Sequence, residues 1–346
     1  METPPKRLLS IDLLRGVCAL GVAIYHLASW LDLAHLYNLG LYGVYAFFVI
    51  SGASMTLAYD GRFARGYSIP KFLALRYARL APLYVAICVY VVLVALVTGQ
   101  LDHELLGKAA LNVTFLFAFA NPGDTSIVVG GWSLGIEFVF YLLFPLLIAL
   151  SRQRWYPALA AGLVVLQIVF VNLLLSGSTD FVESWSRYTQ FGSFAGYFAV
   201  GVWIGRRRLA TANRRVHERV AAGVAILAAT PLLFAHGASS VDSLTGLRGT
   251  LIAVCTLLLV ASVAEIDLRG GAARAAEVLG DVSYPVYLLH PVVFALMRSR
   301  RVLGGFADVH PIMFAAVVLA TSLAVAVVVH RRIETPLVQR LRAAVG

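Results

Sequence analysis

Residues 13–26 read LLRGVCALGVAIYH, an almost unbroken apolar stretch that nevertheless contains Arg15 and His26. Apolar runs long enough to cross a hydrocarbon core of about 30 Å recur along the whole chain. Hydrophobic residues make up 60% of the 346 residues and charged residues only 13%, which a soluble domain of this length does not show. The sequence therefore predicts an all-α integral membrane protein.

Ten segments are predicted to cross the membrane as helices, and no polar stretch between them is long enough to fold separately. The segments are residues 11–31, 39–59, 80–98, 131–150, 156–175, 188–205, 219–236, 247–264, 282–298 and 310–330. Residues 105–120 are also apolar, but a crossing there would place Arg152 and Arg154 opposite the other basic loops. We expect that segment to be re-entrant or peripheral, within a single transmembrane domain over residues 1–346.

The basic residues predict the orientation of the bundle. If the N-terminus is inside, the inner segments hold 21 of the 28 lysines and arginines, and RSRR (residues 298–301) is the main exception. By the positive-inside rule, both termini are expected in the cytoplasm. The net charge of +10 is thus attributed to topology, and no nucleic-acid partner is expected. The cysteines lie within apolar segments at positions 18, 88 and 255, so neither disulfides nor a metal site is expected.

Arg15 and His26 are predicted to be functional, because ionisable side chains within a bilayer are costly and face protein or water. Their spacing places them about 20° apart around a helix and about 16 Å apart along its axis. They cannot readily touch each other, but both can line one cavity. Asp12, three residues before Arg15, can pair with it as a structural ion pair, or the same depth can suit anion binding.

Glu137 is the second candidate for chemistry. It lies in GGWSLGIEFVFY (residues 130–141). Glu137 is expected about 9 Å below the outer end of the bundle and His26 about 7 to 8 Å below it, so their depths match. A carboxylate beside a buried histidine would fix its tautomer and make it more basic, which suits proton removal from an alcohol. The alternatives are a structural histidine bonded to a neighbouring helix and a structural Glu137.

Three further motifs are less specific. In RYARLAP (residues 76–82), Arg76 and Arg79 share a helix face and can hold one phosphate-bearing ligand, or they bind lipid headgroups or mark topology. In FFVISG (residues 47–52), the small residues Ser51 and Gly52 would let a backbone or a ligand approach closely, although small residues in membrane helices usually serve packing. In DVSYPVYLLHP (residues 281–291), Tyr287 and His290 share a face, while Tyr284 also fits an interfacial tyrosine belt.

Taken in order, six blocks resemble acyltransferase family 3 of the membrane-bound acyltransferases: IDLLRGVCALGVAIYH, GVYAFFVISG, RYARLAP, WSLGIEFVFY, LGDVSYPVYLLHP and RRIETPL. The resemblance covers nearly the whole chain. It implies a transmembrane helix bundle that transfers an acyl group, most often acetyl, from cytoplasmic acyl-CoA to a sugar hydroxyl. Acceptors in the family include surface polysaccharides, lipopolysaccharide, peptidoglycan and macrolide-type antibiotics.

The resemblance also implies roles for individual residues. Arg15 and His26 match the family's essential pair, Arg76 and Arg79 match its RxxR motif, and Glu137 matches the glutamate of the fourth block. The residues expected to contact substrate are Trp132, Ser133, Tyr287 and His290. Tyr45 stands where many members have an acidic residue, so no polar role is carried over to that position.

These observations lead to one expected mechanism. The phosphates of acyl-CoA would bind near Arg76, Arg79 and Arg15, and His26 would act as general base on the acceptor hydroxyl, with a covalent acyl-histidine as the variant route. The acceptor is expected to be a cell-surface glycan, a lipid-linked precursor or a glycosylated small molecule. The expected location is the bacterial inner membrane, with lipid as a partner. No metal and no permanently bound cofactor are expected.

A transporter or flippase for a glycan or a lipid-linked intermediate is the second hypothesis. Helices with embedded Arg, Glu and His fit a proton-coupled carrier on physical grounds, although no internal repeat supports one. The two classes differ in a simple way. An enzyme consumes acyl-CoA and releases free CoA thiol, whereas a carrier needs neither.

Overall fold

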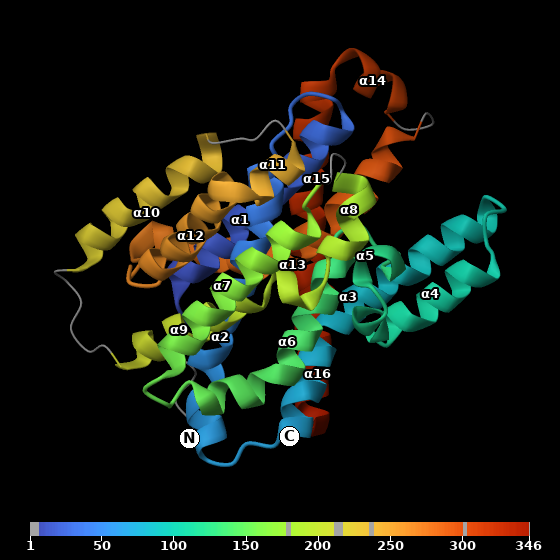
Figure 1. The fold of residues 1–346 in the computed structure, drawn as a ribbon. Coiled ribbons are helices and arrows are strands. Elements are labelled where there is room, and N and C mark those ends of the chain that lie inside the picture. Colours follow the sequence, from blue (N-terminus) through green and yellow to red (C-terminus); the bar gives the residue numbers. More distant parts are fainter. Residues whose placement is uncertain (1–6, 178–180, 211–216, 235–238, 300–302, 346) are drawn as a thin grey trace. The chain divides into compact units, whose positions relative to one another are not determined.

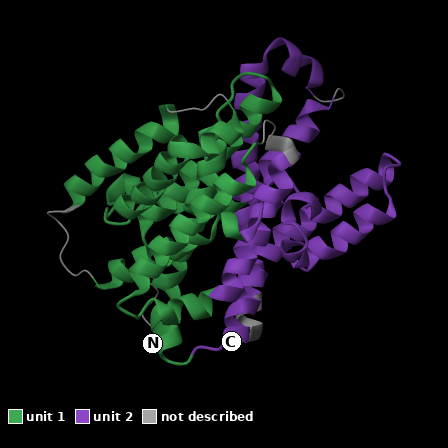
Figure 2. Cartoon of the chain, in the orientation of Figure 1, with its two compact units in different colours: residues 1–66, 144–182, 192–284 green, residues 67–143, 183–191, 285–346 purple. Residues whose placement is uncertain are grey.

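The computed structural model describes residues 7–177, 181–210, 217–234, 239–299 and 303–345, and every regular element in these ranges is helical (Figure 1). The chain divides into two compact units (Figure 2). Unit 1 contains Met1–Gly66, Phe144–Val182 and Gly192–Tyr284, and unit 2 contains Tyr67–Leu143, Glu183–Phe191 and Pro285–Gly346. The predicted all-α fold is confirmed, while the single transmembrane domain stays a prediction.

Unit 1 is built around α2 (Tyr37–Ala64), which packs against α1 (Leu9–Trp30), α9 (Ala195–Ala210) and α12 (Gly246–Val263). Its other helices are α7 (Tyr156–Leu174), α10 (His217–Phe234) and α11 (Ser240–Leu244). In the most apolar stretch of α2, 78% of the residues are buried, against 17% in that of α7. Exposed apolar surface of this kind is expected of helices that face lipid rather than water.

Helices α2 and α9 approach each other at glycines. A Cβ atom at Gly201 would lie 2.1 Å from the carbonyl oxygen of Val49, and one at Gly52 would lie 2.4 Å from that of Phe198. Only hydrogen fits at such positions, as is typical of close contacts between membrane helices. The structure therefore supports the packing interpretation of FFVISG. Tyr45, one turn before Val49 on α2, is buried against the rings of Phe194 and Tyr197.

Unit 2 contains α3 (Ile69–Val97), which packs against α4 (His103–Val113) and α16 (Thr335–Val345). The last helix is formed by α15 (Pro311–Val329), which continues through the π-helical turn η3 (His330–Glu334) into α16. The shorter elements of this unit are η1 (Leu116–Phe119), α5 (Pro122–Thr125) and α14 (Gly304–Val309). The first unit boundary, after Gly66, lies between α2 and α3. The other boundaries fall within α6 (Gly131–Leu150), α8 (Phe181–Tyr188), η2 (Phe191–Ser193) and α13 (Gly270–Arg298).

Within the described residues, eight helical segments are long and apolar enough to cross a membrane. They are α1, α2, α3, α6, α7, α12, α13 and the run Pro311–Arg340. The chain is thus a multi-pass membrane protein. Helices α9 and α10 occupy the places of the expected sixth and seventh crossings. The count of ten and the cytoplasmic position of both termini stay predictions.

Two helices begin earlier than the sequence predicts. The third span was expected from residue 80, but α3 starts at Ile69, where Ser68 accepts a hydrogen bond from the Lys71 amide and Pro70 lies in the first turn, a typical start of a helix. The ninth span was expected from residue 282, but α13 starts at Gly270. As a result, the RxxR pair and the DVSYPVYLLHP block lie inside long helices rather than at their entrances.

The apolar segment 105–120 does not form a long helix. It contains most of α4, which has 11 residues, and the short turn η1. A helix of that length spans about 16 Å, roughly half of a hydrocarbon core. This agrees with the expectation of a segment that does not cross the membrane on its own.

Candidate active site

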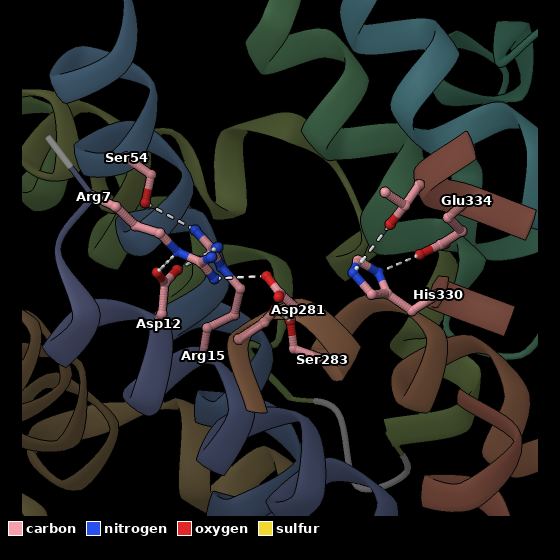
Figure 3. A network of polar contacts seen from close by, with 10 residues as sticks. Arg7, Asp12, Arg15, Ser54, Asp281, Ser283, His330 and Glu334 are labelled. Carbon is pink, nitrogen blue, oxygen red and sulfur yellow. Dashed lines mark hydrogen bonds and ion pairs between the residues drawn. The ribbon is translucent and has the colours of Figure 1, made fainter. Parts of the chain in front are cut away.

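Arg15 belongs to a charged network in unit 1 (Figure 3). Its guanidinium donates to Asp12 Oδ1 at 3.1 Å and to the hydroxyl of Ser54 on α2 at 2.8 Å. The side chains of Asp12 and Arg15 are only 8% and 19% exposed, so the pair is mostly desolvated and needs these bonds. The predicted ion pair between Asp12 and Arg15 is confirmed, and an anion-binding role of Arg15 stays a prediction.

Arg7 extends the same network. It donates to Asp12 Oδ2 and, at 2.7 Å, to Asp281 Oδ1 on α13. Burial lowers the pKa of Arg7, but the hydrogen bonds and charges of Asp12 and Asp281 outweigh this effect and raise the pKa above its usual value. The network thus contains two cations and two carboxylates, and it joins α1, α2 and the part of α13 that belongs to unit 1.

His26 lies one turn before the end of α1 and is half-buried. Its imidazole is stacked on the ring of Trp30 with centroids 5.0 Å apart, and the ring of Tyr25 lies at 5.1 Å. Stacking engages the faces of the imidazole and fixes its plane. His26 belongs to unit 1 and Glu137 to unit 2, so their pairing stays a prediction.

Glu137 accepts a hydrogen bond from a side chain of its own helix. The hydroxyl of Tyr141, one turn further along α6, donates to Glu137 Oε1 at 2.7 Å. The same Tyr141 is almost fully buried, and the guanidinium of Arg76 lies 5.9 Å from its ring centroid. Tyr141 therefore links the carboxylate of the fourth block to an arginine of the RxxR motif within unit 2.

A second polar group lies at the N-terminus of α6. The hydroxyls of Ser133 and Tyr287 are 2.9 Å apart, and both lie within hydrogen-bond distance of the carbonyl oxygen of Gly130, at 2.9 and 3.0 Å. Gly130 has a φ of +77°, and a Cβ atom there would lie 2.8 Å from the Tyr287 hydroxyl. Glycine is thus required both for the backbone conformation and for the approach of Tyr287.

The remaining substrate-contact candidates also belong to unit 2. Trp132 packs edge-on against Trp185, with ring centroids 5.2 Å apart. His290 is buried, lies against the ring of Tyr287 at 6.4 Å, and donates from Nδ1 to the carbonyl of Val286 at 3.0 Å. The predicted shared face of Tyr287 and His290 is confirmed. Their contact with a substrate stays a prediction.

Polar side chains form a stripe along α6. Ser133, Glu137 and Tyr141 follow one another at four-residue intervals, so they share one face and extend over about 12 Å of the helix. Tyr287 adjoins one end of the stripe and Arg76 the other. We call Ser133, Glu137, Tyr141, Arg76 and Tyr287 the α6 stripe.

The structure thus brings together within unit 2 several predicted residues that the sequence presents in separate motifs. Sequence analysis missed Tyr141, although its spacing from Glu137 is a recognisable helical pair. It also missed the contact of His330 with Glu334 on η3, because a π-helical turn leaves no signal in hydrophobic periodicity. Ser54, the partner of Arg15, was missed because it comes from a different helix.

Comparison with known proteins identifies the family. A family model described as an acyltransferase domain matches residues 8–331. The chain belongs to acyltransferase family 3. The residues of the α6 stripe and of the Arg15 network after Arg7 lie within the matched range, so these clusters are parts of an acyltransferase-family membrane protein.

Three relatives of this family-3 acyltransferase illustrate its range. Exopolysaccharide production protein ExoZ of Rhizobium meliloti (strain 1021) is 25% identical over 92% of the chain and 96% of ExoZ. Acyltransferase MdmB of Streptomyces mycarofaciens is 26% identical over 98% of the chain and 94% of MdmB. O-acetyltransferase OatA of Staphylococcus aureus (strain NCTC 8325 / PS 47) is 31% identical over 50% of the chain, but over only 29% of OatA. No solved structure matches the chain.

Proposed function

We propose that this family-3 acyltransferase transfers an acyl group, which we take to be acetyl, from cytoplasmic acyl-CoA to a hydroxyl of a sugar. The acceptor is a cell-surface glycan, its lipid-linked precursor or a glycosylated small molecule. The names of ExoZ and OatA, which refer to exopolysaccharide production and O-acetyl transfer, support a glycan acceptor and an ester product. The proposed location is the bacterial inner membrane, where the cytoplasmic donor and an acceptor on a lipid carrier can both reach a membrane enzyme.

The observation that carries this proposal is the α6 stripe. It connects the RxxR motif, which suits a phosphate-bearing donor, to the carboxylate of Glu137 and onward to the hydroxyls of Ser133 and Tyr287. A stripe of polar groups inside an apolar bundle marks a path for a polar ligand. Acyl transfer between a cytoplasmic donor and an acceptor at the other membrane face requires such a path.

In the proposed reaction, the phosphates of acyl-CoA are bound by Arg76 and Arg79. His26 removes the proton of the acceptor hydroxyl, and the oxygen attacks the thioester carbonyl to form a tetrahedral intermediate. The carbon–sulfur bond then breaks, and the CoA thiolate takes from His26 the proton that came from the acceptor hydroxyl. Glu137 and Arg15 are the other proposed catalytic residues. No metal or bound cofactor has a role in this scheme.

Family membership favours acyl transfer over the transporter or flippase hypothesis. All three named relatives are described by acyl transfer or by polysaccharide production, and none by transport. The embedded charges, which fit a carrier equally well, find a role in donor and acceptor binding.

Release of free CoA thiol from acetyl-CoA by the purified, lipid-reconstituted protein tests the proposal, with an extract of cell-surface glycans as acceptor. We expect release by the wild type and a loss of about 100-fold or more in His26→Ala, the effect of removing a general base. His103→Ala, which alters an exposed histidine at the start of α4, is the matched control and should release thiol at the wild-type rate. Equal rates in all three proteins would contradict the role of His26.

A further inference from the structure

The turn η3 interrupts the last helix of unit 2 with π-helical hydrogen bonding. Such turns are uncommon, and they occur frequently at functional sites. The block RRIETPL (residues 331–337) begins within this turn, and the reaction proposed above uses none of its residues. The turn therefore needs an explanation of its own.

The π-turn brings His330 into contact with two side chains. Its Nδ1 lies 3.2 Å from Glu334 Oε2, and its Nε2 lies 3.3 Å from Thr335 Oγ1 (Figure 3 shows His330 and Glu334). In a regular α-helix, residues five apart point about 140° away from each other, so His330 and Thr335 would not meet. With the proton on Nδ1, the imidazole donates to Glu334 and accepts from Thr335. The imidazole, oriented by Thr335, thus holds one oxygen of the Glu334 carboxylate.

One oxygen of Glu334 still needs a donor. The side chain is 12% exposed, and its Oε1 atom is fully buried and accepts no hydrogen bond from the described residues. A buried carboxylate oxygen in this condition is costly, and such exceptions call for an explanation. The arrangement provides an acceptor that is held in place and ready for a ligand.

The position of this acceptor points to the ligand. Helix α3 packs against both η3 and α16, and the positive charge of Arg79 acts on the Glu334 carboxylate. Within unit 2, the buried oxygen is therefore close to the RxxR motif. A ligand whose phosphates bind to Arg79 has its neighbouring groups within reach of this part of η3.

We propose that Glu334 is a further donor-binding residue, whose Oε1 accepts a hydrogen bond from an N–H or O–H group of the acyl carrier. This inference rests on the proposed function, because it takes CoA as that carrier. CoA offers such groups in its adenosine part and in its pantetheine arm. Arginines alone bind any polyphosphate, whereas Glu334 adds a requirement for a hydrogen-bond donor beside the phosphates and so contributes specificity for CoA.

Equilibrium binding of CoA to the full-length protein in lipid nanodiscs tests this inference. Glu334→Gln should weaken binding about three- to tenfold, because a neutral amide oxygen accepts a weaker hydrogen bond than a carboxylate oxygen does. The direction of the change in CoA affinity distinguishes the two roles of Glu334. A Glu334 that only neutralises Arg79 predicts tighter binding in Glu334→Gln, because the substitution removes a negative charge near the phosphates. Glu104→Gln alters a glutamate of unit 2 that also has a partner four residues away but is 74% exposed, and this control should bind CoA within twofold of the wild type.

Two fragments identify the group that Glu334 recognises. Adenosine 3′,5′-bisphosphate reports on the nucleotide and phosphopantetheine on the arm, and Glu334→Gln should weaken only the fragment that bears the group. Thr335→Val, which removes the hydroxyl partner of His330, should weaken CoA binding by a smaller factor. It decides the question if Glu334→Gln does not fold. Unchanged or tighter binding in the folded variants would overturn this inference alone, whereas a wild type that binds no CoA would overturn the proposed donor as well.

Discussion

At the scale of single residues, Tyr141 has the most informative position in the candidate active site. Its hydroxyl bonds to Glu137 and its ring lies beneath Arg76, so one side chain contacts a proposed catalytic carboxylate and a proposed donor-binding arginine. The sequence directs attention to Glu137 and Arg76 because both are ionisable. Tyr141 escapes notice because an aromatic residue in an apolar helix is ordinarily a core residue.

The two contacts of Tyr141 can be separated. Tyr141→Phe removes the hydrogen bond but keeps the ring, so kcat should fall about ten- to hundredfold, corresponding to a bond to a charged group of about 1.5–3 kcal/mol. The KM for acetyl-CoA should stay within about twofold. Tyr141→Leu also removes the ring beneath Arg76, so its KM should rise about three- to tenfold. Steady-state thiol release at varied acetyl-CoA measures both constants.

Tyr77→Phe is the matched control for these variants, because it removes a hydroxyl that bonds to the Val113 carbonyl in the same unit. It should leave both constants near their wild-type values. If Tyr141→Phe and Tyr141→Leu changed kcat and KM alike, Tyr141 would be a packing residue and not a link between the two sites.

At the scale of elements, the sequence predicts where most helices lie but not how they pack. Periodicity and apolar length locate α1, α2, α6 and α7 closely, because lipid requires long apolar helices. The early start of α3 was missed, since its first turns carry arginines and polar caps that hydropathy counts as loop. Packing of α2 on α9 could not be predicted, because the position of a glycine in the sequence does not show which neighbouring backbone it contacts.

Gly201→Ala tests the contact between α2 and α9. The new methyl group would meet the Val49 carbonyl, so the helices must separate, and we expect destabilisation by about 1–3 kcal/mol or more. The variant should unfold at a lower temperature in detergent, as followed by intrinsic fluorescence. Gly162→Ala on α7 is the control, because a Cβ atom there meets open space, and alanine should be neutral or stabilising. Equal melting temperatures for Gly201→Ala and the wild type would contradict the close approach.

For the molecule as a whole, topology matters most, since a cytoplasmic donor must reach the RxxR motif. The distribution of lysine and arginine predicts the orientation, and no contact within the bundle can replace that evidence. Composition does not predict which side chains contact one another inside the bundle. Arg15 with Ser54, and Glu137 with Tyr141 and Arg76, follow from packing rather than from any one motif.

Cysteine labelling tests the orientation. Gln153→Cys lies in an expected inner loop and Gln100→Cys in an expected outer loop, and both positions are exposed. In intact cells, a membrane-impermeant maleimide should label Gln100→Cys but not Gln153→Cys, and both should react after permeabilisation. Cys255 is replaced by serine in both variants because it is only partly buried, whereas Cys18 and Cys88 are buried and can stay. Labelling of Gln153→Cys alone in intact cells would invert the topology.

Transfer of labelled acetyl from acetyl-CoA to a glycan is the first measurement to make, because it follows the proposed reaction itself. The purified, lipid-reconstituted protein would be given [14C]acetyl-CoA and a defined surface glycan, and the glycan would be isolated. We expect label on the glycan in an alkali-labile ester, in an amount equal to the free CoA released, and none above background with His26→Ala. An intact acetyl-CoA pool and an unlabelled glycan, with folded protein and with each acceptor class tried, would contradict acyl transfer and favour a carrier instead.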